Sequence, residues 1–263
     1  MLYGILDGAP VMVKPYADHF SQLAPDYASY RPAYPDGLFD YLAGLVNRHD
    51  LAWDCAAGSG QATIPLARRF NRVVATDISA TMLGQAPRHP AVEYRVAPGE
   101  ASGLGDATAD LVSVAQALHW LDIESFYAEV NRVLVPGGVL AVWTYGAQHL
   151  DEPALDSVLR HFYAEVVGPY WPPGRRHVEA GYRTLPFPFP ELEPPALAMQ
   201  ELWSLRQLVG YVGTWSATQR LREAVGHDPV DQLGHDLAQH WGDPAASRLI
   251  RWPLSLRVGR RPV

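Results

Sequence analysis

The sequence predicts an α/β fold in which a mostly parallel β-sheet carries helices on both faces. Between residues 51 and 146, short runs rich in β-branched residues alternate with segments of helical periodicity, a pattern typical of parallel strands joined by crossover helices. These strand runs are nearly continuously apolar, as expected when helices cover both faces of a sheet. The 263 residues are 48% hydrophobic and 19% charged, which suits one large domain with a sizeable core.

Seven strands are expected in chain order. They are LAWDCAA (51–57), RVVATDIS (72–79), VEYRVAP (92–98), DLVSVAQA (110–117), GVLAVWTY (138–145), LAMQELWS (197–204) and SRLIRWPLSLRVG (247–259). The most regular helix is predicted to follow Asp122, an N-cap residue with Glu124 in the first turn, and to end before Pro136 and Gly137. Two further helices are predicted at about 205–225 and 229–241, whereas 168–195, rich in proline and aromatic residues, is predicted to be ordered but irregular.

The composition limits the partners of the chain. A formal net charge of -7 argues against a nucleic acid, because phosphate backbones are bound by clusters of Lys and Arg, and it favours a small molecule. The single cysteine, Cys55, excludes an internal disulfide and is expected to be a buried structural thiol. With no secretory cleavage pattern and no window of the roughly 20 apolar residues that a membrane-spanning helix needs, we expect a cytoplasmic protein without a membrane segment. Residues 1–11 are interpreted either as a disordered extension or as an artefact of the start site, because Met12 opens a more ordinary polar sequence.

The first predicted strand ends in an acid and a glycine turn. Asp54 lies at the strand tip, four residues before Gly58, and Gly58 and Gly60 provide a tight turn at a helix start. Thr63 stands where a dinucleotide-binding turn would have its third small residue. Because a carboxylate repels a pyrophosphate but attracts an ammonium or sulfonium group, the pattern favours a ligand that is cationic at this end.

Three further strand tips carry polar side chains that point to the same crevice. Asp77 ends the second strand, where a carboxylate is typical of a ribose-hydroxyl clamp. An amino-acid end together with a ribose indicates S-adenosylmethionine. The third strand leads to Glu100, near the expected adenine, and the fourth leads to Gln116 and His119, near the expected reacting centre.

At this point the sequence resembles the class I S-adenosylmethionine-dependent methyltransferases, and among them the small-molecule group that includes the trans-aconitate methyltransferases. The resemblance is carried by YASYRPAYP (27–35), WDCAAGSGQ (53–61), VVATDIS (73–79), VEYRVAPGE (92–100), AQALHWLD (115–122), RVLVPGG (132–138), GYRTLPFPFPE (181–191) and YVGTWSA (211–217). It implies one domain with a Rossmann-like, seven-stranded, mostly parallel sheet, an antiparallel last strand and a helical substrate cap. Residues 1–47 would form an extension and lid, 48–147 the cofactor-binding core, 148–245 the cap with the sixth strand, and 246–263 the final strand.

The resemblance also assigns cofactor-binding residues. They are Asp54, Ala56, Gly58 and Gly60 for the methionine part, Asp77 for the ribose, Ile78 and Met82 for the flank of the adenosine, Gly99 and Glu100 for the adenine edge, Gln116 for the sulfonium, and Tyr27 and Arg31 from the lid. For the segment with Tyr27, Tyr30 and Arg31, a surface helix start is the alternative. Ala56 departs from the family, which has glycine there. Since alanine adopts a positive φ only at a cost, we expect either ordinary β backbone at Ala56 or a shifted loop.

The implied reaction is methyl transfer from S-adenosylmethionine to a small organic acceptor, with a carboxylate oxygen as the first candidate by family analogy, while a nitrogen, sulfur or carbon acceptor remains open. A metal is not required, and a base is needed only where the acceptor must lose a proton. His119 is predicted to be that catalytic base or a polar wall; alternatively it only fixes its loop against Trp120.

Substrate residues are expected in the second half of the chain. Arg175, Arg176 and Arg183 are predicted to bind an anionic group, unless they form ordinary surface ion pairs. Tyr182 has the same two alternatives as Arg183 beside it. Either Trp203, Tyr211, Trp215 and Ser216 wall the substrate pocket or they hold the cap to the sheet. Two other functions remain open, an NAD-dependent oxidoreductase and a non-catalytic S-adenosylmethionine-binding protein, and the sequence does not indicate the oligomeric state.

Overall fold

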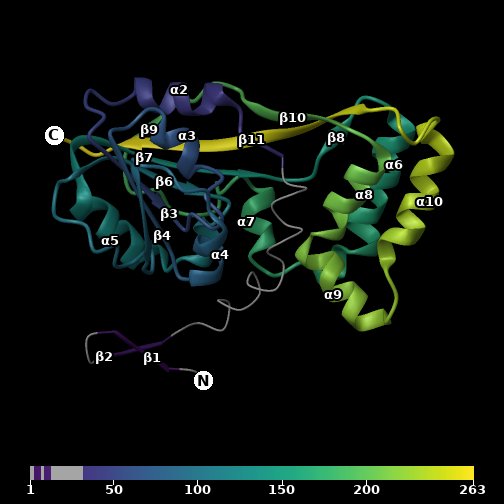
Figure 1. The fold of residues 1–263 in the computed structure, drawn as a ribbon, viewed down its shortest axis with the longest axis horizontal. Helices are drawn as coiled ribbons and strands as arrows, with labels where there is room; N and C mark the ends of the chain where they lie inside the picture. Colours follow the sequence, from purple (N-terminus) through teal and green to yellow (C-terminus); the bar gives the residue numbers. More distant parts are fainter. Residues whose placement is uncertain (1–2, 7–8, 13–31) are drawn as a thin grey trace.

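The computed structural model describes residues 3–6, 9–12 and 32–263. A sheet with flanking helices and a separate group of helices lie side by side along the longest axis of the molecule, and the long strand β11 runs through both (Figure 1). Near the N-terminus, β1 (Tyr3–Leu6) and β2 (Ala9–Met12) pair antiparallel, a hairpin that the sequence analysis did not predict.

The main sheet contains all seven predicted strands. Its order from edge to edge is β10 (Ala198–Trp203), β11 (Arg248–Arg260), β7 (Leu134–Tyr145), β6 (Ala109–Ala115), β3 (Leu51–Cys55), β4 (Arg72–Asp77) and β5 (Val92–Val96). The five strands from β7 to β5 are parallel, while β11 runs antiparallel to both β7 and β10. The prediction of a mostly parallel Rossmann-like sheet with an antiparallel last strand is therefore confirmed.

The strand order reverses beside β3. The chain passes from β3 outward to β4 and β5, then returns to β6 and β7 on the other side of β3. Loops that leave neighbouring strands in opposite directions open a crevice at the carboxyl ends of the strands, where ligands of such sheets bind. Asp54, Asp77 and Gln116 all lie at this edge, at or just beyond the ends of β3, β4 and β6.

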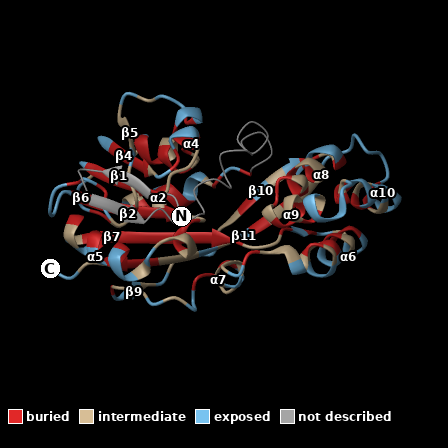
Figure 2. Cartoon of the chain, turned by 90° about the horizontal axis from the view of Figure 1, so that it is seen from below, coloured by how far each residue is buried: buried red, intermediate tan, exposed pale blue. Residues whose placement is uncertain are grey.

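Apolar side chains cover both faces of the sheet. On one face, α2 (Asp36–Gly44) and α3 (Thr63–Ala67) bury Phe39 and Leu66, and on the other α5 (Ile123–Val133) buries Phe126 and Val130. The central strands between them are almost entirely buried (Figure 2), whereas the edge strand β5 is only partly buried. Two further short helices lie at the strand ends, α4 (Ala80–Gln85) and the 3₁₀ turn η1 (Leu118–Trp120).

Local sequence signals explain most helix boundaries. The backbone N–H of Ser125 donates to Asp122 Oδ1 at 3.1 Å, which confirms Asp122 as the N-cap of α5. This helix ends at Val133, earlier than predicted, because the chain already pairs with β6 from Leu134 onward. The helix predicted at 205–225 is interrupted at Thr214 and Trp215.

The cap is a group of four helices with an apolar interior. They are α6 (Pro153–His161), α8 (Leu205–Gly213), α9 (Ser216–Val225) and α10 (Pro229–Trp241). Each turns its buried side inward and its exposed side outward (Figure 2), and their interior belongs to the same apolar cluster as the α2 face of the sheet. Between α6 and β10 the chain forms the π-helical turn η2 (Phe162–Val166), the 3₁₀ turn η3 (Gly168–Tyr170) and α7 (Arg175–Glu179). The helical cap is thus present, and 168–195 is irregular as expected apart from η3, α7 and a two-residue strand at Glu191–Leu192.

Strand β11 joins the two parts. Residues 254–260 pair with β7, and residues 248–253 pair with β10. The short strands β8 (His149–Leu150) and β9 (Glu191–Leu192) also pair with β11. The segment 146–148, between β7 and β8, lies where the chain leaves the core sheet for the cap.

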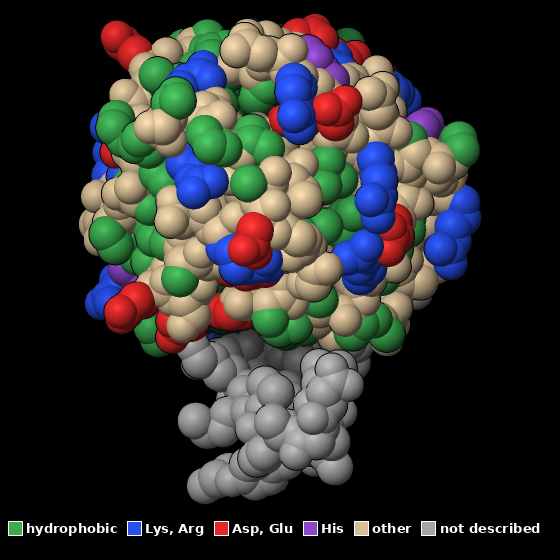
Figure 3. Space-filling view, turned by 90° about the vertical axis from the view of Figure 1, so that its left-hand side faces the viewer, with side chains coloured by type: hydrophobic (Ala, Val, Ile, Leu, Met, Phe, Trp, Pro, Cys, Tyr) green, Lys and Arg blue, Asp and Glu red, His purple; other side chains and the backbone are tan. Residues whose placement is uncertain are grey.

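Charges of both signs are interspersed on the face at the sheet end of the molecule (Figure 3). Ion pairs such as Arg132–Asp106, at 2.6 Å, and Arg257–Glu191, at 2.7 Å, are typical of the described surface.

In the part of the chain that the structure describes, no helix has the length and hydrophobicity needed to span a membrane.

Candidate active site

Asp77 connects the glycine turn after β3 to the start of α4. Its Oδ2 accepts a hydrogen bond from the backbone N–H of Gly58, and its Oδ1 accepts one from the N–H of Ser79, both at 2.8 Å. Burial raises the pKa of Asp77 above its usual value, although these backbone donors act in the opposite direction. The carboxylate lies at the rim of the crevice, and each oxygen keeps a lone pair for a further donor.

Asp54 lies beneath the same turn and is completely buried. Its Oδ2 accepts from the hydroxyl of Thr63 at 2.6 Å and its Oδ1 from the hydroxyl of Ser113 at 2.9 Å. Burial raises the pKa of Asp54 to about 6, and the nearby charge of Asp77 adds to this effect. The predicted direct contact between Asp54 and a cationic ligand is therefore corrected, because the side chain faces α3 and β6 and not the crevice.

Three residues of the turn have a left-handed backbone conformation, with positive φ. Ala56 has φ of +55°, followed by Gly58 at +55° and Gly60 at +82°. The expectation of ordinary β backbone or a shifted loop at Ala56 is therefore wrong: alanine takes the conformation that glycine would adopt, at a cost of roughly 1–2 kcal/mol. A β-carbon at Gly60 would lie 3.1 Å from both Ala86 Cβ and the hydroxyl of Tyr94, so this position also needs glycine for space.

The predicted adenosine-binding residues fall into two groups. Ile78 is 53% exposed directly after Asp77, and Met82 lies next to Gly58, so both flank the crevice. Gly99 has a packing role instead, since a β-carbon there would lie 2.9 Å from Cys55 Sγ. Glu100 accepts the N–H of Asp122 at 2.8 Å and so holds the start of α5.

Gln116 bridges the ends of β6 and β7. Its φ is +55°, its backbone N–H donates to the carbonyl of Trp143 at 2.9 Å, and its side-chain amide donates to the carbonyl of Tyr145 at 3.1 Å. The hydroxyl of Thr144 donates to its Oε1. These contacts hold the Gln116 side chain at the border between the crevice and a pocket next to the cap.

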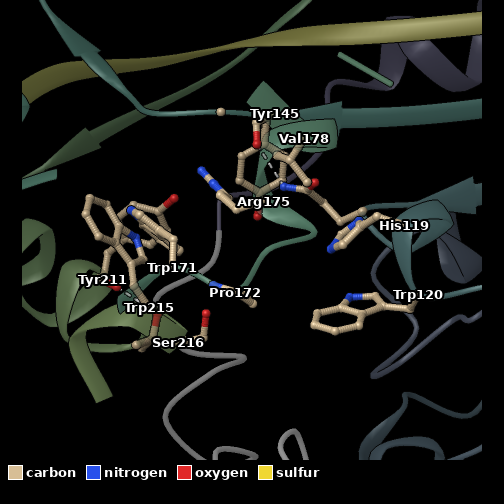
Figure 4. A pocket seen from close by; sticks show the side chains of 13 residues that line it. His119, Trp120, Tyr145, Trp171, Pro172, Arg175, Val178, Tyr211, Trp215 and Ser216 are labelled. Carbon is tan, nitrogen blue, oxygen red and sulfur yellow. Dashed lines mark hydrogen bonds between the residues drawn. The ribbon is translucent and has the colours of Figure 1, made fainter. Parts of the chain in front are cut away.

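This pocket has a volume of about 100 Å³ and lies between the core and the cap (Figure 4). Its lining residues come from the ends of β6 and β7, from α7 and the loop before it, and from α8 and α9: Gln116, His119, Trp120, Tyr145, Gly146, Trp171, Pro172, Arg175, Val178, Tyr211, Thr214, Trp215 and Ser216. In Figure 4, His119 and Trp120 form one wall and Trp171, Tyr211 and Trp215 the opposite one, with Arg175 between them.

Arg175 brings a positive charge into this pocket. Its Nε donates to the hydroxyl of Tyr163 at 2.9 Å, and its guanidinium lies 4.4 Å from the centre of the Trp171 ring. Glu179 is its nearest acid, with an oxygen 3.9 Å from Nε, but that carboxylate is half-exposed. Within the described part of the chain, the two terminal nitrogens of Arg175 donate no hydrogen bond, so they are available to a ligand.

The aromatic wall is a packed cluster. Trp215 contacts the rings of Tyr163, Trp171 and Tyr211, with centroid distances of 5.6 to 5.7 Å. Trp203 lies outside the pocket and packs on Trp252 at 5.1 Å. The four residues therefore divide between the two predicted positions: Tyr211, Trp215 and Ser216 line the pocket, whereas Trp203 packs where the cap meets the sheet.

His119 is neutral at pH 7 in this environment. Burial, followed by the positive charges of Arg175 and His177, lowers the pKa of His119 to about 4. Its Nδ1 lies 3.0 Å from the hydroxyl oxygen of Tyr182, a fully buried side chain. A histidine with so low a pKa is a weak base.

The other predicted substrate residues lie elsewhere. Arg176 and Arg183 are exposed and do not line the pocket, so the structure does not bring them together with Arg175. Consecutive residues of a helix point in different directions, which separates Arg176 from its neighbour. Tyr27, Tyr30 and Arg31 lie outside the described residues.

Comparison with known proteins identifies the family. Residues 53–142 match the family model described as "Methyltransferase domain". An uncharacterized methyltransferase of Mycobacterium tuberculosis is 31% identical over 216 residues, which cover 81% of this chain and 83% of that protein. A protein of Dictyostelium discoideum named as a methyltransferase is 29% identical over 225 residues, or 84% of this chain and 86% of that one. A solved structure described as a type II methyltransferase from Anaeromyxobacter dehalogenans has 44% identity and a TM-score of 0.85, and the match covers 89% of this chain and 100% of that one. The chain belongs to the class I S-adenosylmethionine-dependent methyltransferases.

The crevice of this methyltransferase fits its methyl donor. A carboxylate at the rim with free lone pairs suits ribose hydroxyls, and the exposed Ile78 beside it offers apolar surface to a flat base. The two acids, one buried and one at the rim, place negative charge near a cationic ligand. In the described residues, no group of three or more His, Cys, Asp and Glu side chains is arranged to hold a metal ion.

Membership in this family disfavours the NAD-dependent oxidoreductase, and the enzyme is a methyltransferase rather than a non-catalytic binding protein.

Sequence reasoning missed Tyr145 and Thr144 as site residues. Tyr145 ends the fifth predicted strand, so the rule that ligands lie at carboxyl ends of strands was a usable signal.

Proposed function

We propose that this methyltransferase transfers the methyl group to a carboxylate oxygen of a small organic acid that binds in the pocket beside the cap. The observation that carries the proposal is Arg175, which among the described lining residues is the only one with a permanent charge. An anion would bind to its free terminal nitrogens in a site that aromatic rings shield from water. The resemblance to trans-aconitate methyltransferases favours the same acceptor class, and the volume of about 100 Å³ supports a small one.

The proposed donor site is the neighbouring crevice. Asp77 would accept hydrogen bonds from the ribose, Ile78 and Met82 would flank the adenosine, and the turn with Gly58 and Gly60 would receive the methionine part. Asp54 would act through its charge and through its support of the turn. Gln116, at the border between crevice and pocket, would lie near the sulfonium.

The bound donor supplies a methyl group activated by a positively charged sulfur. The protein then has to position the acceptor and exclude water, which is the main source of acceleration in such a displacement. Arg175 would orient the carboxylate, and the Trp171 and Trp215 rings would shield it. Because a carboxylate is ionised at pH 7, the reaction needs no base, in agreement with the low pKa of about 4 at His119.

A paired substitution tests the acceptor class. The full-length enzyme is assayed for S-adenosylhomocysteine release with a panel of small carboxylic acids, amines, thiols and phenols. Wild type is expected to act on carboxylic acids, and Arg175→Gln is expected to raise the KM for them at least tenfold, as loss of a charge-assisted hydrogen bond predicts. Arg176→Gln, one residue away and exposed, is the control and should leave KM unchanged. Methylation of amines or thiols alone, or an equal effect of the two variants, would contradict the proposal.

A further inference from the structure

A chain of polar contacts runs behind the wall of the acceptor pocket. The carbonyl of Tyr145 can only accept, so the amide NH₂ of Gln116 must point to it and the amide oxygen must face Thr144. The hydroxyl of Thr144 therefore donates its hydrogen bond to Gln116 Oε1 and is left with only acceptor capacity. The next group along is the phenol of Tyr182, which interacts with Thr144 and lies 3.0 Å from Nδ1 of His119.

The position of one proton decides what His119 presents to the pocket. The phenol of Tyr182 is fully buried, so its proton needs an acceptor. Among the described residues, two acceptor atoms compete for it, the hydroxyl oxygen of Thr144 and Nδ1 of His119. Burial raises the pKa of the phenol, whereas the hydrogen bond of the Leu118 backbone lowers it, so that backbone acts as a donor. An imidazole nitrogen is far more basic than an alcohol oxygen, and Nδ1 of His119 lies 3.0 Å from the phenol oxygen, within hydrogen-bond distance.

We propose that Tyr182 donates to Nδ1 of His119 and so fixes the neutral tautomer with its proton on Nε2, which donates a hydrogen bond into the pocket beside Arg175. His119 is then a binding residue for the carboxylate of the acceptor, and Tyr182 is the positioning residue that sets its tautomer. The inference rests on the proposed function in one respect, because it assumes an anionic acceptor.

The surroundings of His119 support a donor role. In Figure 4 its imidazole lies at the wall opposite the aromatic cluster, and Arg175 lies between the two walls of the same pocket. A β-carbon at Gly174 would lie 3.1 Å from His119 Cδ2, so the start of α7 packs against the ring and limits its rotation. The charges of Arg175 and His177 disfavour the imidazolium, and the ring stays neutral while it donates. Both residues line the same pocket, so a carboxylate with two oxygens could accept from each of them.

The tautomer can be observed directly in the full-length protein without any acceptor. In ¹⁵N spectra of protein labelled at histidine, the resonances that disappear in His119→Gln belong to His119. We expect a protonated Nε2 and an unprotonated Nδ1 in wild type, and a loss of this preference in Tyr182→Phe. Tyr127→Phe removes the hydroxyl of another buried tyrosine, which donates to the carbonyl of Pro186 at 2.9 Å, and should leave the His119 resonances unchanged. A protonated Nδ1 in wild type would overturn the inference.

Kinetics give an independent readout. For the best carboxylic acid, His119→Asn and Tyr182→Phe are expected to raise KM about tenfold with kcat within about twofold, because they remove binding and no proton transfer. His119→Gln, whose amide reaches the position of Nε2, should retain more of the wild-type KM than His119→Asn. A large loss of kcat with constant KM would show a base and overturn the inference.

The two proposals fail separately. If the spectra show the Nε2 tautomer but no carboxylic acid is methylated, the proposed function fails. If carboxylic acids are methylated with the other tautomer present, only this inference fails.

Discussion

The carboxylate of Asp77 accepts a hydrogen bond from the backbone N–H of Gly58 at 2.8 Å. Asp77, the last residue of β4, thereby holds the glycine turn that follows the neighbouring strand β3. The same carboxylate caps the segment leading into α4 through Ser79. The side chain proposed to bind the donor ribose therefore also holds the geometry of the turn.

Asp77→Ala is expected to weaken the binding of S-adenosylhomocysteine by roughly 1–3 kcal/mol, the usual effect of losing hydrogen bonds to a charged group. Isothermal titration calorimetry measures the change. Glu223→Ala, an exposed acid on α9, is the matched control. Unchanged affinity in Asp77→Ala would exclude the proposed ribose site.

Ala56→Gly is expected to stabilise the protein by roughly 0.5–1 kcal/mol, because glycine relieves the positive φ of +55° but adds freedom to the unfolded chain. The neighbouring Ala57→Gly lacks that strain and should destabilise by a similar amount. Urea unfolding of both variants measures the difference, and a loss of stability in Ala56→Gly would show that the left-handed turn is not strained.

Asp54 makes the free energy of unfolding depend on pH. Its pKa is about 6 in the folded protein, above the ordinary value of 3.8, so the folded state holds this proton more tightly. The resulting stabilisation is fully present below about pH 3.8 and is lost as pH rises through about 6, by at most roughly 3 kcal/mol. Relative to wild type, Asp54→Asn should therefore become more stable between pH 4 and pH 7 by up to that amount. Urea unfolding at each pH tests this, and a difference that stays constant with pH would refute it.

Gly99→Ala is expected to destabilise by roughly 1–3 kcal/mol, since its new methyl group would lie 2.9 Å from Cys55 Sγ and 3.0 Å from Leu121. In a Cys55→Ala background the cost should fall, giving a coupling energy of about 1 kcal/mol in a double-mutant cycle. Gly84→Ala on α4, where nothing lies within 4 Å, is the control and should be neutral or stabilising. Additive effects of Gly99→Ala and Cys55→Ala would show that the sulfur is not the obstacle.

The strands and helices were predictable where apolar residues follow a regular pattern along the chain. The apolar run Val73–Ala75 within β4 and the apolar face of α5 show such patterns, and Asp122 marks the start of α5. The break at Thr214 and Trp215 was not predictable from periodicity, because Trp215 packs on Trp171, a residue distant in sequence.

The candidate site was predictable to the level of strand ends but not of side-chain direction. Asp54 was placed at the right strand end, yet it faces Ser113, its register partner on β6, and this pairing is fixed only when the strands assemble. Arg175 and Arg176 are indistinguishable in sequence, and only the packing of α7 against the pocket separates them.

Strand β11 changes its partner at one point between the core sheet and the cap. Main-chain pairing with β7 ends at Leu254, opposite Tyr145, and pairing with β10 begins at the next residue, Pro253. A substitute for residues 146–253 taken from a relative would leave every hydrogen bond between β7 and β11 in place, because a backbone ladder is indifferent to side-chain identity. We expect divergence confined to that stretch to alter the part of the proposed acceptor pocket that the cap supplies, while the residues of the proposed donor site, all before residue 146, are retained.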